Sequence, residues 1–198
     1  TKSEAFRAHA FEYVRETISD ILEEETPEVF EKLGIDVVLG EAEFISKCSV
    51  KVDKVEYTYK HAVIATGSSP RLIDIPGLST ERMLTNQNLF TLTEIPKQLL
   101  IVGGGPIGLE MAQAFAMLGS HVTITERSDE LARLEDPVIR KIVHDNFADL
   151  GITIVTNASL ERVHDDTMAI LKDKHGVTRE ISFDKVLIAI GRIPNLPP

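Results

Sequence analysis

Residues 98–126 read QLLIVGGGPIGLEMAQAFAMLGSHVTITE, and this stretch sets the architecture of the chain. Residues 99–102 form an apolar run typical of a buried strand. After a glycine-rich turn, residues 109–118 carry apolar side chains around most of a helical surface, which predicts a helix packed between layers. Residues 122–125 repeat the buried-strand pattern and end at Glu126. Two strands joined by a helix in this way form a parallel βαβ unit.

The pattern continues toward the C-terminus. Asp136 is a suitable cap for a second helix that ends near residue 150, and residues 152–155 form a third apolar strand. Residues 159–183 alternate and turn in the manner of antiparallel strands, and residues 186–190 form one more buried strand. We therefore predict an α/β fold, a Rossmann-like parallel sheet with helices on both faces and an antiparallel β excursion.

Toward the N-terminus the period changes. Residues 6–22 show apolar side chains at helical spacing, and Pro27 interrupts them. Residues 35–59 predict small antiparallel strands, and residues 62–65 predict a compact apolar strand. Residues 68–77 are rich in serine, proline and glycine, so we expect a connecting loop and a domain boundary there.

The turn after the first strand carries the spacing of a dinucleotide-binding fingerprint. Gly103 permits the tight turn, Gly105 lets a pyrophosphate approach the backbone, and Gly108 lets the helix pack closely against the strand. Glu126 follows 23 residues after Gly103, close to the interval of about 20 residues typical of the acidic residue that binds the adenosine ribose. A glycine-rich turn that binds nothing is the alternative.

The fingerprint predicts NAD(H) as ligand. A carboxylate at position 126 accepts hydrogen bonds from both ribose hydroxyls and repels a 2′-phosphate, so NAD is favoured over NADP, although the adjacent Arg127 softens that preference. Pro106 and Ile107 complete the phosphate-binding turn. Glu110, near the start of the helix, either complements the helix dipole or lies near the nicotinamide, and the residues do not decide between these.

Composition excludes several other classes of protein. Acidic residues outnumber basic ones by 31 to 21, for a net charge of −10, which disfavours nucleic acid and anionic membrane as partners. Cys48 is the one cysteine, so neither an intrachain disulfide nor a redox pair forms, and we predict a reducing, cytoplasmic compartment. The six histidines show no ligand spacing, and we predict no metal site and assign no catalytic residue.

Three sequence blocks resemble a known family. They are VIATGS at 63–68, GGGPIGLE at 103–110 and AIGRIPN at 189–195. In this order they are similar to the FAD-dependent pyridine nucleotide–disulfide oxidoreductases, such as dihydrolipoamide dehydrogenase, glutathione reductase and mercuric reductase. The resemblance extends over nearly the whole chain.

The resemblance implies a domain organisation and further cofactor contacts. It places residues 1–77 in part of an FAD-binding domain, residues 78–190 in an NAD(P)-binding domain, and residues 191–198 in a return to the FAD domain. It also implies further cofactor-binding residues: Thr66, Gly67 and Arg192 toward FAD, Gly191 toward the pyridine nucleotide, and Glu110 toward the nicotinamide.

The family's first glycine fingerprint, its paired redox cysteines and its C-terminal His-Glu block find no match here. The resemblance therefore implies a central portion of a longer enzyme, whose parent passes hydride from NADH to FAD and on to a disulfide, a metal ion or a quinone-like acceptor. It also implies a homodimeric parent, and a chain without disulfide-reductase activity by itself. A stand-alone NAD(H)-binding or redox-sensing module and an unrelated α/β protein with an empty glycine loop are the alternatives.

Overall fold

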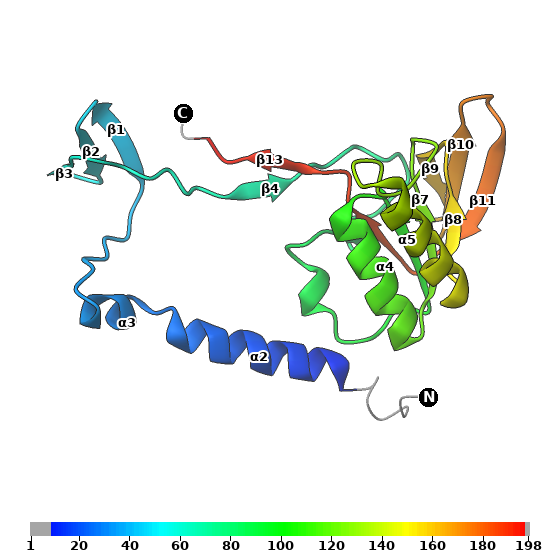
Figure 1. The fold of residues 1–198 in the computed structure, drawn as a ribbon, viewed down its shortest axis with the longest axis horizontal. Helices are drawn as coiled ribbons and strands as arrows, with labels where there is room; N and C mark the ends of the chain where they lie inside the picture. The colour runs from blue at the N-terminus through cyan, green and yellow to red at the C-terminus, as the bar shows by residue number, and fades with distance from the viewer. Residues whose placement is uncertain (1–8, 197–198) are drawn as a thin grey trace. The chain divides into compact units, whose positions relative to one another are not determined.

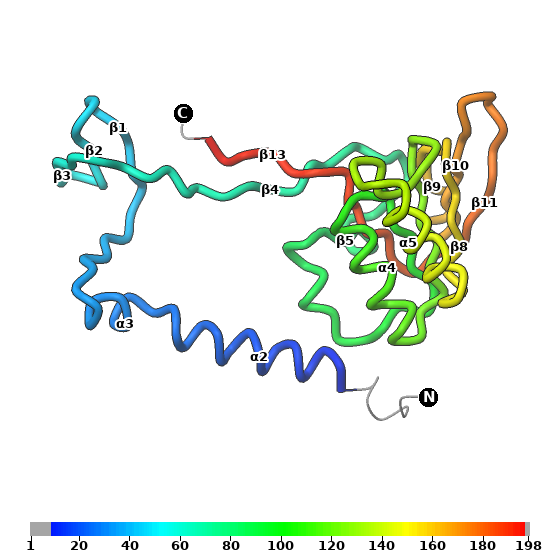
Figure 2. Tube along the Cα trace, viewed as in Figure 1, coloured from blue at the N-terminus to red at the C-terminus, as the bar shows by residue number. Residues whose placement is uncertain are grey.

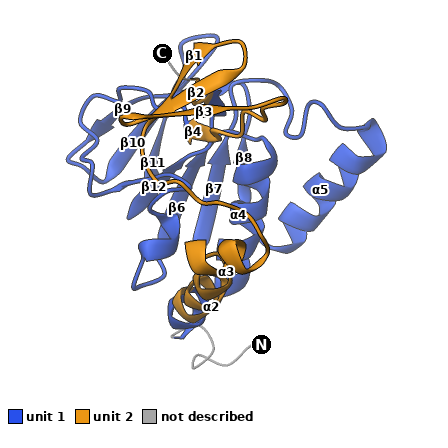
Figure 3. Cartoon of the chain, turned by 90° about the vertical axis from the view of Figure 1, so that its left-hand side faces the viewer, with its two compact units in different colours: residues 1–14, 70–193 blue, residues 15–69, 194–198 orange. Residues whose placement is uncertain are grey.

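The computed structural model describes residues 9–196, which divide into two compact units. Unit 1 comprises residues up to Val14 and residues 70–193, and unit 2 comprises residues 15–69 and the segment from residue 194 onward (Figure 3). The chain therefore crosses between the units at three places, near residues 14, 69 and 193, whereas the predicted domain boundaries lie at 77 and 190. The assignment of these ranges to an NAD and an FAD domain stays a prediction.

Unit 1 is built on a parallel sheet. Its five strands run in the order β5-β12-β6-β7-β8. They are β5 (Met83–Leu84), β12 (Lys185–Ile188), β6 (Gln98–Val102), β7 (His121–Thr125) and β8 (Thr153–Val155). The helices of this unit are α4 (Pro106–Leu118) and α5 (Pro137–Asp149), with a short 3-10 helix, η1 (Leu89–Thr91). The predicted β-α-β-α-β order is confirmed, and so is the α/β class with a parallel sheet and an antiparallel excursion.

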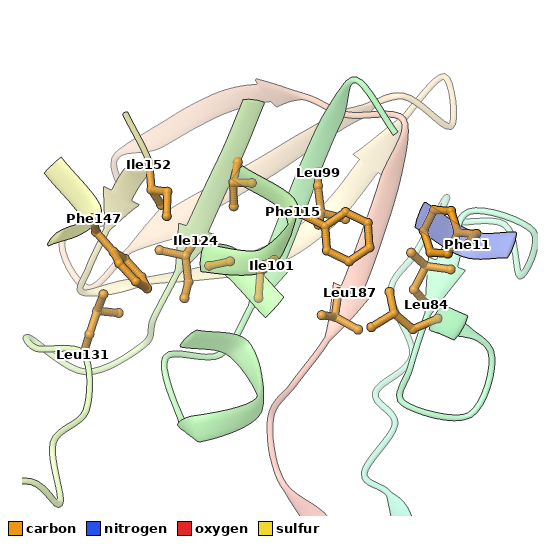
Figure 4. Close-up of a cluster of buried hydrophobic side chains, with 13 residues drawn as sticks. Phe11, Leu84, Leu99, Ile101, Phe115, Ile124, Leu131, Phe147, Ile152 and Leu187 are labelled. Atoms are coloured by element: carbon orange, nitrogen blue, oxygen red, sulfur yellow. The ribbon is translucent and has the colours of Figure 1, made fainter. Parts of the chain in front are cut away.

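Side chains of the sheet alternate between two apolar clusters, as the two-residue period of a strand requires. On β6, Leu99 and Ile101 belong to one cluster, and Leu100 to the other. The first cluster includes Phe115 of α4 and Phe147 of α5, so both helices cover the same face of the sheet (Figure 4).

The opposite face is covered differently from the prediction. It packs against β9 (Ala158–His164) and β10 (Met168–Asp173), which form an antiparallel sheet with β11 (Thr178–Ser182). The chain enters this sheet from β8 and leaves it for β12 (Figure 2). Helices therefore lie on one face rather than on both, because the antiparallel excursion itself connects β8 to β12 and occupies the second face.

Unit 2 contains most of α2 (Ala10–Glu24), then α3 (Pro27–Lys32) and a three-stranded antiparallel sheet (Figure 1). The strands of this sheet are β1 (Ala42–Ser46), β2 (Ser49–Val52) and β3 (Val55–Thr58), in that order. The predicted helical segment, apart from Phe6, which lies outside the described residues, its interruption at Pro27 and the small strands after residue 41 are confirmed. The apolar run at 35–39, which was included in the predicted strands, has no regular structure.

The predicted strand at 62–65 is wrong. Residues 61–67 have no regular structure, and Val63 is 91% exposed. A strand needs a hydrogen-bonded neighbour, and no strand within residues 9–196 pairs with this segment. Shortly after it, β4 (Ser68–Pro70) pairs with β13 (Arg192–Pro194), within a stretch predicted to be a loop.

Candidate functional site: a glycine-lined cleft in unit 1

In the turn between β6 and α4, neighbouring backbone atoms leave no room for a side chain at Gly103 or Gly108. Gly103 has a φ of +117°, and a side chain there would collide with the carbonyl oxygen of Ala189. A side chain at Gly108 would collide with the carbonyl oxygen of Gly103. Both positions therefore require glycine, one for the turn and the other for the packing of α4 against it.

Gly105 is different, because no atom lies within 4 Å of the position that a Cβ would take. This residue caps α4, and Pro106 begins the helix. The first N–H groups of a helix have no partner within it, and together with the helix dipole they favour a negatively charged group. The space left at Gly105 lets such a group approach the backbone, so the turn fits a pyrophosphate.

Glu126 follows β7 and is tied to this turn. Its Oε2 accepts a hydrogen bond from the N–H of Gly104 at 2.7 Å. Its Oε1 accepts from the N–H of Ser128 at 2.8 Å and from the Ser128 hydroxyl at 2.7 Å. Partial burial raises the pKa of the Glu126 carboxyl, but the hydrogen bonds from Ser128 and Gly104 and the charge of Arg127 outweigh burial and lower the pKa. The carboxylate is therefore held in its charged form.

A cleft of about 780 Å³ lies over the turn, at the carboxyl ends of β6, β7 and β12. Ligands of doubly wound α/β sheets bind in such a crevice. Its charged lining residues are Arg71, Arg127, Arg192 and Glu126. Although the whole chain is acidic, the cleft thus has more positive than negative side chains, which favours an anionic ligand.

Most of the predicted cofactor-binding residues line this cleft. They are Gly103, Gly105, Pro106, Ile107, Glu126, Arg127, Gly191 and Arg192. Gly108 lies buried under the turn, as its packing role requires. Glu110 is exposed in the first part of α4 and is not among the lining residues, so its contact with a nicotinamide stays a prediction.

Thr66 and Gly67 belong to unit 2 and interact with Asn195. The Thr66 hydroxyl donates to the Asn195 carbonyl oxygen, and the Asn195 side chain donates to the Thr66 carbonyl oxygen at 3.1 Å. The N–H of Asn195 donates to the carbonyl oxygen of Gly67 at 3.0 Å. Their predicted role toward a flavin is not tested by these contacts.

Sequence reasoning missed several residues of the site. Ser128 donates two hydrogen bonds to the Glu126 carboxylate. The sequence does contain a signal for this role, because the hydroxyl and the N–H of a serine two residues after an acidic residue readily donate to its carboxylate. Arg71 and Ser159 also line the cleft, and they come from segments far along the chain with no local motif.

The described residues show no metal centre and no membrane-crossing helix. Within residues 9–196, no three histidine, cysteine or acidic side chains are grouped so that they could hold a metal ion. The helices of that same range are all too short or too polar to cross a bilayer.

Comparison of the sequence with curated proteins finds several oxidoreductases. The chain is 32% identical over 180 residues to a mercuric reductase of Staphylococcus aureus, a match that covers 90% of this chain and 33% of the relative. It is 36% identical over 169 residues to a dihydrolipoyl dehydrogenase of Bacillus subtilis strain 168, covering 81% of this chain and 36% of the relative. The chain thus spans about a third of the length of these relatives.

Solved structures give the same result. The Cu(II) complex of the HOCl-induced flavoprotein disulfide reductase RclA from Escherichia coli matches with a TM-score of 0.79 and 31% identity, over 95% of this chain and 43% of that one. LpdA from Mycobacterium tuberculosis matches with a TM-score of 0.75 and 26% identity, over 90% of this chain and 41% of that one. The profile of the pyridine nucleotide-disulphide oxidoreductase family matches residues 3–197. The chain therefore belongs to the pyridine nucleotide-disulphide oxidoreductase family.

Proposed function

We propose that the cleft of unit 1 binds NAD(H), and that the chain is the NAD(H)-binding central portion of a flavin-dependent oxidoreductase. One observation carries the proposal. In a turn closed by backbone at Gly103 and Gly108, the position of Gly105 is open, and it lies at the start of a helix. A turn that served packing alone would not require this open position beside the helix N-terminus.

The residues around the turn have separate tasks in this proposal. The N–H groups of the first turn of α4 bind the pyrophosphate. Arg71, Arg127 and Arg192 make the cleft attractive to a dianion before it docks. Glu126 accepts a hydrogen bond from the adenosine ribose, and its charge opposes a 2′-phosphate, so NAD is preferred to NADP.

The proposal extends to a flavin through unit 2. Gly67 has a φ of +70°, and the nearest atom to a Cβ there would be the Asn195 side-chain nitrogen at 4.0 Å, so its backbone is open to a ligand. Thr66, Gly67 and Arg192 would contact FAD, within the flavin-binding parts at residues 1–77 and 191–198. When bound, NADH supplies a hydride and FAD receives it, for onward transfer to a disulfide, a metal ion or a quinone-like acceptor. We propose a cytoplasmic, homodimeric parent protein.

Titration of the 198-residue chain with NADH, followed by the coenzyme's own fluorescence, tests the proposal directly. We expect saturable binding, and we expect Glu126→Ala to weaken it by about 1–3 kcal/mol, the value of one or two hydrogen bonds to a charged group. Glu180→Ala, an exposed residue of β11 outside the cleft, is the matched control and should bind as the unchanged chain does.

Two results would contradict the proposal. If the unchanged chain does not bind NADH, the cleft is not a coenzyme site. If Glu126→Ala binds with an unchanged dissociation constant, Glu126 does not belong to the site.

A further inference from the structure

Ser128 donates two hydrogen bonds to one oxygen of the Glu126 carboxylate, Oε1. Its N–H and its hydroxyl both donate to Oε1, at 2.8 Å and 2.7 Å. An ionised carboxylate oxygen offers about two acceptor directions, so these two donors fill Oε1. Oε2 accepts from the N–H of Gly104 at 2.7 Å and keeps one direction free.

The backbone around both residues is fixed from the neighbouring strand connection. The carbonyl oxygen of Ser128 accepts from the N–H of Asn157 at 2.8 Å. The N–H of Glu126 donates to the carbonyl oxygen of Val155 at 2.9 Å, and its carbonyl oxygen accepts from Ala158 at 3.1 Å. Ser128 therefore acts from a rigid position, and its hydroxyl limits the rotation of the Glu126 side chain.

This arrangement has a consequence for the choice of coenzyme. With Oε1 filled, the carboxylate can accept one ribose hydroxyl on Oε2 without breaking a bond that it already makes. A 2′-phosphate in the same place would face a fixed negative charge that cannot turn away. If Glu126 were free to rotate, the adjacent Arg127, which also lines the cleft, could pair with that phosphate.

We infer that Ser128 is a positioning residue that sets coenzyme selectivity, since it locks the Glu126 carboxylate where a ribose hydroxyl is accepted and a 2′-phosphate is repelled. This inference rests on the proposed NAD(H)-binding function. It concerns one hydroxyl group, so it predicts that removing the hydroxyl changes the ratio of the two coenzyme affinities rather than binding in general.

The test compares dissociation constants for NADH and NADPH in three variants of the 198-residue chain. Ser128→Ala keeps the N–H and loses the hydroxyl; we expect NADH binding to weaken about three- to tenfold and NADPH binding to stay or improve. Ser128→Thr keeps a hydroxyl and should restore most of the selectivity. Ser182 lies on β11 outside the cleft, and its hydroxyl donates to the side chain of Gln98. Ser182→Ala removes that hydroxyl and should leave both constants unchanged.

The outcomes separate this inference from the proposed function. If the unchanged chain binds neither coenzyme, the proposed function is wrong and the selectivity role is wrong with it. If the unchanged chain binds NADH but Ser128→Ala keeps the wild-type ratio, or weakens both coenzymes equally, the inference alone is overturned. Loss of selectivity in Ser128→Ala with recovery in Ser128→Thr supports it.

Discussion

Unit 1 and unit 2 use apolar residues in opposite ways. In unit 1, residues such as Leu100, Ile101 and Leu187 are completely buried between two covering layers. In the described part of unit 2, the one buried residue is Ser49, whereas Leu39 is 79% exposed. In both units, most of the helices and strands lie where the sequence pattern predicts them.

The difference teaches that periodicity and burial are separate properties. A pattern of apolar residues predicts which face of a helix or strand would be buried, but burial requires a second layer to cover that face. On α2, Phe11 packs against Phe115 of α4 at a ring-centroid distance of 6.2 Å, whereas Ile21 and Leu22 of the same apolar stripe are at least half exposed. Stability should therefore reside in unit 1.

The largest effect should come from one substitution made in each unit. Leu187→Ala removes a completely buried side chain from the sheet of unit 1, and we expect it to lower the free energy of unfolding by about 3–4 kcal/mol. The same change at the exposed Leu39 should cost less than about 0.5 kcal/mol. Urea unfolding followed by far-ultraviolet circular dichroism measures both, and equal losses would break the comparison.

A smaller effect separates stability from binding within the turn of unit 1. Gly108→Ala drives a methyl group into the Gly103 carbonyl, so we expect a loss of about 1–3 kcal/mol in the free energy of unfolding. Gly105→Ala meets open space and should change that free energy by less than about 0.5 kcal/mol, because a stiffer unfolded chain offsets a poorer helix cap.

Gly105→Ala should have a large effect on NADH binding, although its effect on the free energy of unfolding is small. Gly105→Ala fills the space through which the pyrophosphate approaches, so NADH binding should be lost from a chain that is still folded. If Gly105→Ala bound NADH normally, the open position would have no role in binding, although the fold would stand.

The elements of unit 1 were predictable because each carries its own local signals. The β6 strand is apolar on both faces, Gly119 ends α4 with a φ of 104°, and Asp136 caps α5. The layer over the second face was not predictable, since the alternation of the buried Ala158 and Leu160 with exposed residues on β9 indicates one buried face without indicating what covers it.

The residues of the candidate site were likewise predictable only where a local sequence motif contains them. Gly103, Gly105 and Glu126 lie within one βαβ unit, where sequence spacing fixes their positions in space. Arg71 joins the cleft through folding of distant segments, and the role of Ser128 depends on the direction of two donors, which spacing does not specify. The prediction of a strand at 62–65 was wrong for a related reason, because a strand forms only beside a hydrogen-bonded neighbour, which the local sequence does not specify.

The smallest effect compares two helix starts that look alike. Asp136 and Thr26 both have extended backbone and both precede a proline that begins a helix, α5 in unit 1 and α3 in unit 2. The Asp136 carboxylate accepts from the N–H of Val138 at 2.8 Å, whereas the Thr26 side chain makes no capping hydrogen bond. The same sequence signal therefore has a different physical outcome in each unit.

We expect Asp136→Ala to lower the free energy of unfolding by about 1 kcal/mol, the usual value of a helix cap, and Thr26→Ala to lower it by no more than a few tenths. Asp136→Asn, which keeps an acceptor oxygen, should recover most of the loss, and urea unfolding of all three variants measures these differences. Equal losses from Asp136→Ala and Thr26→Ala would mean that helix starts contribute alike in the two units. The contrast between the units would then be confined to side-chain burial and would not extend to the local hydrogen bonds that begin their helices.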